Sequence, residues 1–245
     1  MCSFKKSVLL SAVLLAVAGG VHAQKAGDYI LSAGIVNVNP NPTLGALSST
    51  GGASAPATAF FNTQTPGASA NISSVNTLTV GLIRMFTDNI AGELAVGIPP
   101  KLTVNVTTPK AAAGASHPDA ATATYLAPAV IAKYLFNKPG DQWRPYVGLG
   151  ATYVSFSDVT ANKSDALVNN LAGTSASLSS SWAPIYNLGA IYNFDERWSI
   201  NASVSYIPVS TTATFISSAA TGGATTTGTL KLDTMDYVIR VGYKF

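Results

Sequence analysis

Cysteine is almost absent from this sequence, and the position of its one cysteine removes it from the folded protein. Cys2 lies within residues 1–23, which hold two lysines, a mostly apolar run and the small-residue ending Val21-His22-Ala23. This order is typical of a secretory signal peptide. We expect cleavage after Ala23. The mature chain, residues 24–245, then has no disulfide and no thiolate metal site, and no metal or other cofactor is expected.

Long apolar runs are missing as well. The apolar run of the signal segment is shorter than the roughly 20 residues of a membrane-spanning helix. Gly, Pro, Ser or a charged residue interrupts every later run. The sequence therefore predicts no helical membrane anchor.

Charge is also scarce. Charged residues make up 10% of the chain, against about 25% in a typical soluble domain. Without Lys5 and Lys6 the 14 basic residues fall to twelve, against 11 acidic ones, so the mature net charge is about +1. This balance gives no reason to expect a nucleic-acid partner. It indicates a surface that faces something other than water, or long uncharged loops.

What the sequence does contain is alternation at strand length. In residues 198–206 the even positions carry Trp, Ile, Ala, Val and Tyr, and the odd positions carry Ser or Asn. A period of two puts these sets on opposite faces of a strand. Similar alternation predicts eight strands, over residues 28–38, 75–86, 90–106, 122–136, 144–156, 181–193, 198–215 and 229–245.

The connections between these strands alternate in length. The short ones are residues 87–89, 137–143 and 194–197, and the long ones are residues 39–74, 107–121, 157–180 and 216–228. Short turns at one rim and long loops at the other are expected of a Gram-negative outer-membrane barrel. The predicted fold class is all-β: an eight-stranded antiparallel transmembrane β-barrel with long extracellular loops and short periplasmic turns. Eight strands enclose an interior that side chains fill, or that holds one small ligand.

Aromatic residues support this prediction. They gather near the short turns, where we expect a girdle at one membrane interface made of Phe86, Tyr134, Phe136, Trp143, Tyr146, Tyr192, Phe194, Trp198, Tyr243 and Phe245. A thinner set toward the long loops includes Tyr125, Tyr153, Phe156, Trp182 and Tyr206. A soluble β-sandwich would explain neither the loop asymmetry nor the aromatic C-terminus. We expect outer-membrane lipids around the barrel and recognition of Phe245 by the barrel-assembly machinery.

Four segments resemble the OmpW family of outer-membrane proteins. They are residues 27–29 (GDY), which open a strand ending at Asn39-Pro40, residues 86–94 (FTDNIAGEL), residues 143–150 (WRPYVGLG) and the ending from Leu232-Asp233 to residues 242–245 (GYKF). The resemblance covers all predicted strands but not the long loops. It implies an eight-stranded barrel for passive uptake of small, mostly hydrophobic molecules through a narrow apolar channel, with a sideways opening into the bilayer as one route.

The resemblance also implies that bulky apolar residues help to close the channel in some members, at positions matching Ala95 and Ser205. Both residues are small here. Any apolar constriction would then come from residues on the same strand face, namely Ile83, Met85, Ile185 or Ile207.

Strand parity extends the list of channel-lining candidates to polar residues. They are Glu93, Lys133, Asn187, Asn201 and Arg240, and Lys244 shares their parity. A charge that faces lipid near the midplane costs roughly 2–4 kcal/mol, so these side chains should point inward. Arg84 has the opposite parity, but it lies near Phe86 and should snorkel to the interface. The inward set forms either a polar constriction on a permeation path or a plug of paired charges that stabilises a narrow barrel.

Apolar residues of the long loops are candidates for an extracellular funnel: Leu44, Leu47, Phe60, Phe61, Leu167 and Leu171. Alternatively, they pack each loop against itself. Two other function classes stay open beside a porin-like channel. One is a non-conducting barrel that acts as a structural anchor or binds through its loops. The other is an enzyme, which would need His117, near Asp119, as its base; a lone loop histidine is seldom catalytic, so we predict no enzymatic activity.

Overall fold

The computed structural model describes residues 24–51, 69–108, 115–218 and 222–245. The predicted signal peptide, residues 1–23, lies outside the described residues, as do Phe60 and Phe61. Helix α2 (Ala166–Ala172) is half-buried along most of its length, and within the described ranges no helix is long and apolar enough to cross a membrane.

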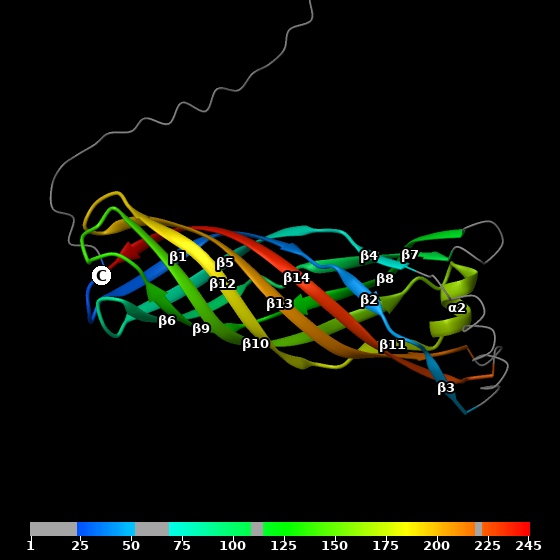
Figure 1. Cartoon of the computed structure of the whole chain (residues 1–245). Helices are drawn as coiled ribbons and strands as arrows, with labels where there is room; N and C mark the ends of the chain where they lie inside the picture. The colour runs from blue at the N-terminus through cyan, green and yellow to red at the C-terminus, as the bar shows by residue number, and fades with distance from the viewer. Residues whose placement is uncertain (1–23, 52–68, 109–114, 219–221) are drawn as a thin grey trace, which may run out of the picture.

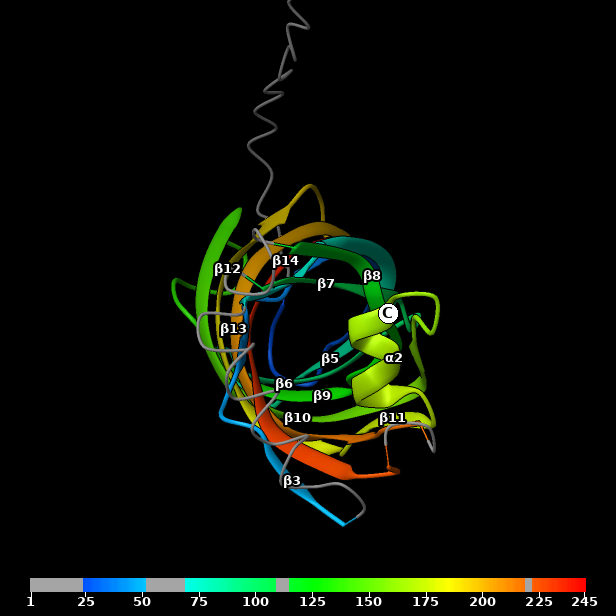
Figure 2. The same cartoon turned by 90° about the vertical axis from the view of Figure 1, so that its right-hand side faces the viewer.

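Antiparallel strands make up most of the described chain and wrap into one barrel (Figures 1 and 2). They are β1 (Tyr29–Asn39), β2 (Pro42–Leu44), β3 (Ser48–Thr50), β4 (Ser69–Ile72), β5 (Val75–Met85), β6 (Ile90–Gly97), β7 (Lys101–Thr108), β8 (Ala115–Leu126), β9 (Ala129–Leu135), β10 (Trp143–Ala161), β11 (Ser175–Leu178), β12 (Ser181–Asn193), β13 (Trp198–Ile216) and β14 (Thr225–Lys244).

The part of the wall nearest the short turns is a closed ring. Around it, β1 is followed by β5, β6, β9, β10, β12, β13 and β14. Strand β14 pairs again with β1, from Lys244 opposite Ile30 to Met235 opposite Asn39. Closure removes the unpaired strand edges that hydrocarbon would not tolerate. The eight-stranded antiparallel barrel predicted from the sequence is confirmed.

Alternation along each strand sorts the side chains into an inner and an outer set. On β13, Asn201 and Ser205 are buried inside, whereas Trp198 and Tyr206 are exposed outside. The outer wall between the rims carries exposed aliphatic side chains, among them Leu31, Ile35, Leu78, Leu94, Val130, Leu149, Leu188 and Ile239. Arg84 points outward too, with its guanidinium 5.4 Å from the ring centroids of Tyr29 and Phe86, so its charge lies at the rim.

Aromatic pairs ring the outer face near the short turns. Trp143 packs on Tyr192 with ring centroids 4.8 Å apart, and Trp198 packs on Tyr243 at 4.9 Å. The girdle prediction is wrong for Tyr146, which is fully buried inside the barrel because it shares the parity of Arg144. In the second aromatic set, Tyr125 and Phe156 also lie inside, whereas Tyr153, Trp182 and Tyr206 are exposed.

Proline interrupts two of the predicted strands. Residues 90–106 are divided into β6 and β7 by Pro99 and Pro100, and Pro128 separates β8 from β9. Proline has no N–H for the ladder and restricts the residue before it. Strand β6 pairs with β5 and β9, but β7 leaves β5 to pair with β4 and β8. The wall is therefore discontinuous at this level.

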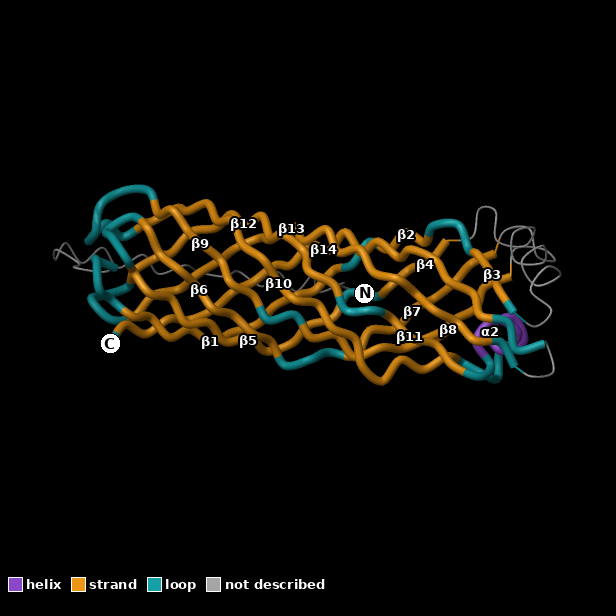
Figure 3. The backbone as a smooth tube through the Cα atoms, turned by 90° about the horizontal axis from the view of Figure 1, so that it is seen from below, coloured by secondary structure: helices purple, strands orange, loops and turns teal. Residues whose placement is uncertain are grey.

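The two rims differ in the predicted way. The short turns and the C-terminus lie at the left-hand end of Figure 1, whereas α2, β3, β4 and β7 lie toward the other end. The long-loop side has more structure than predicted, because β10 continues to Ala161 and β14 already begins at Thr225. Strands β2 and β3 pair with the part of β14 nearest the long loops, so the wall extends beyond the closed ring toward that end (Figure 3).

Candidate functional site

The interior at the short-turn end is packed with side chains. Arg144 has no exposed surface, and its guanidinium donates to the backbone oxygens of Gln24 at 2.7 Å and Asp88 at 2.5 Å. The side-chain amide of Gln24 donates in turn to Asn193 Oδ1 at 2.9 Å. Next to this network lies a buried apolar layer made of Ile30, Ile83, Met85, Ala91, Leu135, Tyr146 and Ile191.

A buried charge cluster follows this apolar layer along the barrel axis. The carboxylate of Glu93, from β6, pairs with Lys133 of β9 and with Arg240 of β14. Lys133 Nζ also lies 4.1 Å from the ring centroid of Tyr146, whose hydroxyl donates to Asn201 Oδ1 at 2.9 Å. Two cations face one carboxylate, so the cluster carries a net positive charge. It ties three strands together across the bore.

Gly81 provides the room for this cluster. A Cβ at this position would collide with the guanidinium of Arg240 and the carboxylate of Glu93. Gly81 is not among the candidates from the sequence, although a glycine inside a strand often marks such a close approach.

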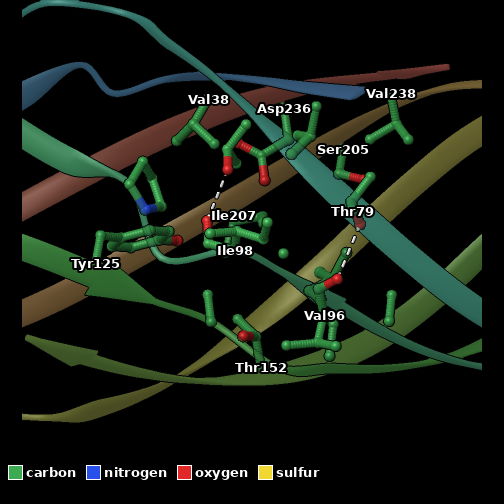
Figure 4. Close-up of a pocket in the computed structure, with 18 of the residues that line it drawn as sticks. Val38, Thr79, Val96, Ile98, Tyr125, Thr152, Ser205, Ile207, Asp236 and Val238 are labelled. Atoms are coloured by element: carbon green, nitrogen blue, oxygen red, sulfur yellow. Dashed lines mark hydrogen bonds between the residues drawn. The ribbon is translucent and has the colours of Figure 1, made fainter. Parts of the chain in front are cut away.

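A cavity of about 80 Å³ lies on the other side of the charge cluster (Figure 4). Its walls are mainly apolar, with Val36, Val38, Ile131, Ile185, Ile207 and Val238, and the hydroxyls of Thr79, Thr152 and Ser205 interrupt them. Arg240 lines the end nearest the cluster. The cavity exceeds the roughly 10–15 Å³ that one water molecule needs.

The cavity meets the wall at the proline interruption. Val96 and Ile98 line it, although their side chains are exposed on the outside. The β6–β9 ladder ends at Ala95 opposite Ala129, and the β7–β8 ladder resumes only at Lys101 opposite Thr124. We call residues 96–100 the lateral gap.

Backbone hydrogen bonds hold the gap to β5 on one side and, across the interruption, to β8 on the other. Ile98 N–H donates to Leu78 O at 2.8 Å, and Tyr125 N–H donates to Pro100 O at 2.9 Å. The side chain of Thr77 adds a third contact, because its hydroxyl donates to Ile98 O at 2.7 Å. Fewer interstrand hydrogen bonds thus hold the wall here than where the ladders are continuous.

Residues 25–245 match the OmpW family. The chain belongs to the OmpW family. It is 30% identical over 242 residues to outer membrane protein W of Vibrio cholerae serotype O1, covering 98% of this chain and 100% of that protein. Outer membrane protein AlkL of Ectopseudomonas oleovorans is 27% identical over 189 residues, which cover 77% of this chain and 71% of AlkL.

A solved structure agrees with this assignment. The crystal structure of the outer membrane protein OprG from Pseudomonas aeruginosa superposes with a TM-score of 0.76 at 25% identity, covering 92% of this chain and 99% of OprG. The protein is therefore an OmpW-family barrel of the outer membrane, as the sequence predicted. Its short-turn end is periplasmic, and the end with α2 is extracellular.

The channel-lining candidates of this OmpW-family chain divide between two levels. Ala95, Ile185, Ser205 and Ile207 line the cavity, and Arg240 borders it. Ile83 and Met85 lie in the periplasmic apolar layer, beyond the charge cluster. Asn187 is buried and donates to Ser205 Oγ at 2.9 Å, and Asn201 accepts from Tyr146. Lys244 lies at the periplasmic rim, 3.6 Å from Asp28 Oδ2.

The four described funnel candidates lie at two separate places on the extracellular side. Leu44 and Leu47 flank Gly228 of β14, with Leu47 buried and Leu44 exposed. Leu167 and Leu171 are half-buried on α2, which lies beside β10 and β13. Between them and the cavity the interior is apolar. The residues there belong to the same hydrophobic cluster as the cavity wall and include Ile72, Leu102, Val154, Val209 and Leu232.

Sequence reasoning missed most of the residues that line the cavity, among them Tyr125, Thr152 and Asp236. The signal for Asp236 was present, because it shares the inward parity of Arg240 on β14. Tyr125 belongs by position to the aromatic set toward the long loops, but its side chain is buried inside the barrel.

His117 and Asp165 join α2 to β8. Asp165 is the N-cap of α2: its Oδ1 accepts from the Val168 N–H at 3.0 Å, while Oδ2 is hydrogen-bonded to His117 Nδ1 at 2.7 Å. Burial opposes ionisation of Asp165, but the bonds from His117 and the backbone outweigh it and lower the pKa of this carboxyl. His117 thus pairs with the helix cap, not with the neighbouring Asp119.

Acidification should release this contact. Because its pKa is lowered on folding, Asp165 stabilises the loop above its unfolded pKa of about 3.9, and this contribution is lost as the pH falls through the folded value. We expect hydrogen exchange at the Val168 amide to accelerate there, after correction for its intrinsic pH dependence. Asp165→Ala should show the faster exchange already at neutral pH. Equal protection of Val168 in acid and at neutrality would contradict this.

Proposed function

We propose that this barrel takes up small hydrophobic molecules passively, through its extracellular half and out through the lateral gap. One observation carries the proposal: the apolar cavity is lined both by inward residues such as Ile185 and by outward residues such as Ile98. A solute in the cavity is therefore adjacent to the hydrocarbon of the bilayer. This agrees with the uptake function and sideways opening that the family resemblance implies.

The packed periplasmic half supports sideways exit. An apolar solute that continued along the axis would have to displace the ion pairs of Glu93 and then the Arg144 network. Breaking a buried ion pair costs about 3–5 kcal/mol. Movement past Val96 and Ile98 breaks no ion pair and ends in a medium that solvates apolar solutes.

The same packing supports a second candidate, a non-conducting barrel that anchors extracellular loops. The charge cluster and the Arg144 network would then serve stability alone. The two functions differ in one respect, because only a channel changes the entry rate of a solute.

Sealed vesicles with a lipopolysaccharide outer leaflet distinguish the two functions, because this leaflet slows apolar solutes. We expect the protein to accelerate entry of hexane by about tenfold, equivalent to lowering the barrier by about 1.4 kcal/mol. Entry of a six-carbon polyol should not change. Equal hexane entry with and without protein would favour the anchor.

We also propose that Phe245 is the signal for the barrel-assembly machinery. Its ring stacks on Tyr29 with centroids 6.1 Å apart, yet its side chain remains largely exposed at the periplasmic rim. An enzymatic function has less support, because His117 is engaged in holding α2.

A further inference from the structure

Two polar side chains of the cavity wall, Asp236 and Tyr125, each have a buried oxygen that no other described residue bonds. Asp236 points inward from β14, at the level where Val38 and Ser205 are its register partners, and Tyr125 is buried on β8. Among the described residues, neither Asp236 Oδ1 nor the Tyr125 hydroxyl forms a hydrogen bond, although both atoms are buried. Figure 4 shows both side chains directed into the group of residues that lines the cavity.

This arrangement is costly unless a ligand or a water molecule bonds the two groups. A buried hydroxyl or carboxylate without a hydrogen bond loses its hydration, and polar groups buried at membrane depth usually mark a functional site. The nearest cation along the strand, Arg240, lies four residues away, about 13 Å at the rise of a β-strand, and its guanidinium is held by Glu93. The remaining cavity wall is mainly aliphatic, interrupted by threonine and serine hydroxyls.

The two groups together define the ligand. The Asp236 carboxylate accepts and the Tyr125 hydroxyl can both donate and accept, so a ligand that also takes the Tyr125 proton must accept and donate at one point. An aliphatic alcohol does this with a single oxygen, and its chain fits walls such as Ile185 and Ile207. An alkane satisfies neither group. An ammonium offers no acceptor to Tyr125, and the net positive charge cluster at the end of the cavity repels it.

We propose that the cavity is a binding site for short aliphatic alcohols, with the hydroxyl held between Tyr125 and Asp236. The inference rests on the proposed uptake function and narrows its substrate class. The channel then prefers apolar solutes that carry one terminal hydroxyl over the corresponding hydrocarbons and amines.

The test uses the full barrel in the same vesicles, with hexanol, hexane and hexylammonium as matched six-carbon probes. Binding is read from the chemical shift of ¹³C-labelled Tyr125 during titration, and transport from the entry rate. We expect hexanol to shift Tyr125 saturably and hexane to leave it unchanged. Tyr125→Phe and Asp236→Val should each lower the hexanol-to-hexane ratio of entry rates by about tenfold, as expected for loss of a hydrogen bond to a charged or buried group.

Asp233→Asn is the matched control. Asp233 lies three residues from Asp236 on the outward-facing parity, where it accepts from the Tyr206 hydroxyl at 3.3 Å. This variant should keep the wild-type ratio. If Asp236→Val does not fold, as judged by heat-modifiable mobility, the isosteric Tyr125→Phe still decides the question.

Each outcome has one meaning. An unchanged hexanol-to-hexane ratio of entry rates in Tyr125→Phe would overturn the alcohol site, as would tighter binding of hexylammonium than of hexanol. Accelerated hexane entry in the same experiment would leave the uptake function intact. Accelerated entry of none of the probes, with hexanol still shifting Tyr125, would overturn the uptake function but support the site.

Discussion

Replacing Glu93 with alanine should lower the free energy of unfolding by about 3–5 kcal/mol, because it leaves Lys133 and Arg240 buried without a counter-charge. Both cations have little exposed surface and neither can turn to water without disrupting the wall. Urea unfolding of the barrel refolded in lipid vesicles, followed by tryptophan fluorescence, measures this change. It is the largest loss of stability that we expect from a single substitution here.

Two further variants make this result specific. Glu196→Ala removes a carboxylate from an exposed turn and should change stability by less than about 0.5 kcal/mol. Replacing all three cluster residues with Leu or Met should recover much of the loss, since apolar residues often replace a buried ion cluster without cost. A loss below about 1 kcal/mol in Glu93→Ala would mean that water reaches the cluster.

Blocking the lateral gap should reduce hexane entry by about tenfold or more. Gly97 lies on the inner side of the gap, and a Cβ there would be 3.4 Å from Leu78 O, an ordinary contact, so the backbone accepts a side chain. The ring in Gly97→Phe would fill the cavity at its exit. Overpacking of this kind costs about 1–3 kcal/mol, and each 1.4 kcal/mol on a barrier slows passage tenfold.

Ala132→Phe is the control for added bulk. Ala132 is exposed on the lipid face of β9, so the same enlargement there leaves the cavity unchanged. Entry rates in vesicles with equal amounts of folded protein give the comparison. Similar rates for Gly97→Phe and the wild type would rule out the gap as the exit.

Period-two alternation was sufficient to predict the ring and the inward direction of Glu93, Lys133 and Arg240. It could not predict that these three side chains meet, because alternation gives the face of a residue but not the register between strands remote in sequence. Glu93 lies opposite Ile131 on β9, and Arg240 opposite Gly34 on β1. Lys133 is a diagonal neighbour of Glu93 on the adjacent strand, and closure of the barrel through β14 and β1 brings Arg240 to both.

The sequence marks the lateral gap with Pro99, Pro100 and Pro128. That these prolines interrupt the same part of the wall follows only from the pairing of the strands. A proline in an apparent strand indicates an edge or a bulge. Here two interrupted strands are neighbours in the wall, so two local defects coincide and form one gap. Tyr146 shows the opposite case, because the parity of Val147 and Leu149 already indicated that its ring points inward.

The path itself is the central claim, and a paramagnetic apolar solute tests it most directly. A short alkane with a nitroxide label should broaden the methyl signals of Ile131, Ile185 and Ile207, which line the cavity. It should leave Ile30 and Ile191 sharp, because these equally buried isoleucines lie beyond the charge cluster. Equal broadening of both sets would contradict the account, since it would place the solute on an axial route to the periplasm.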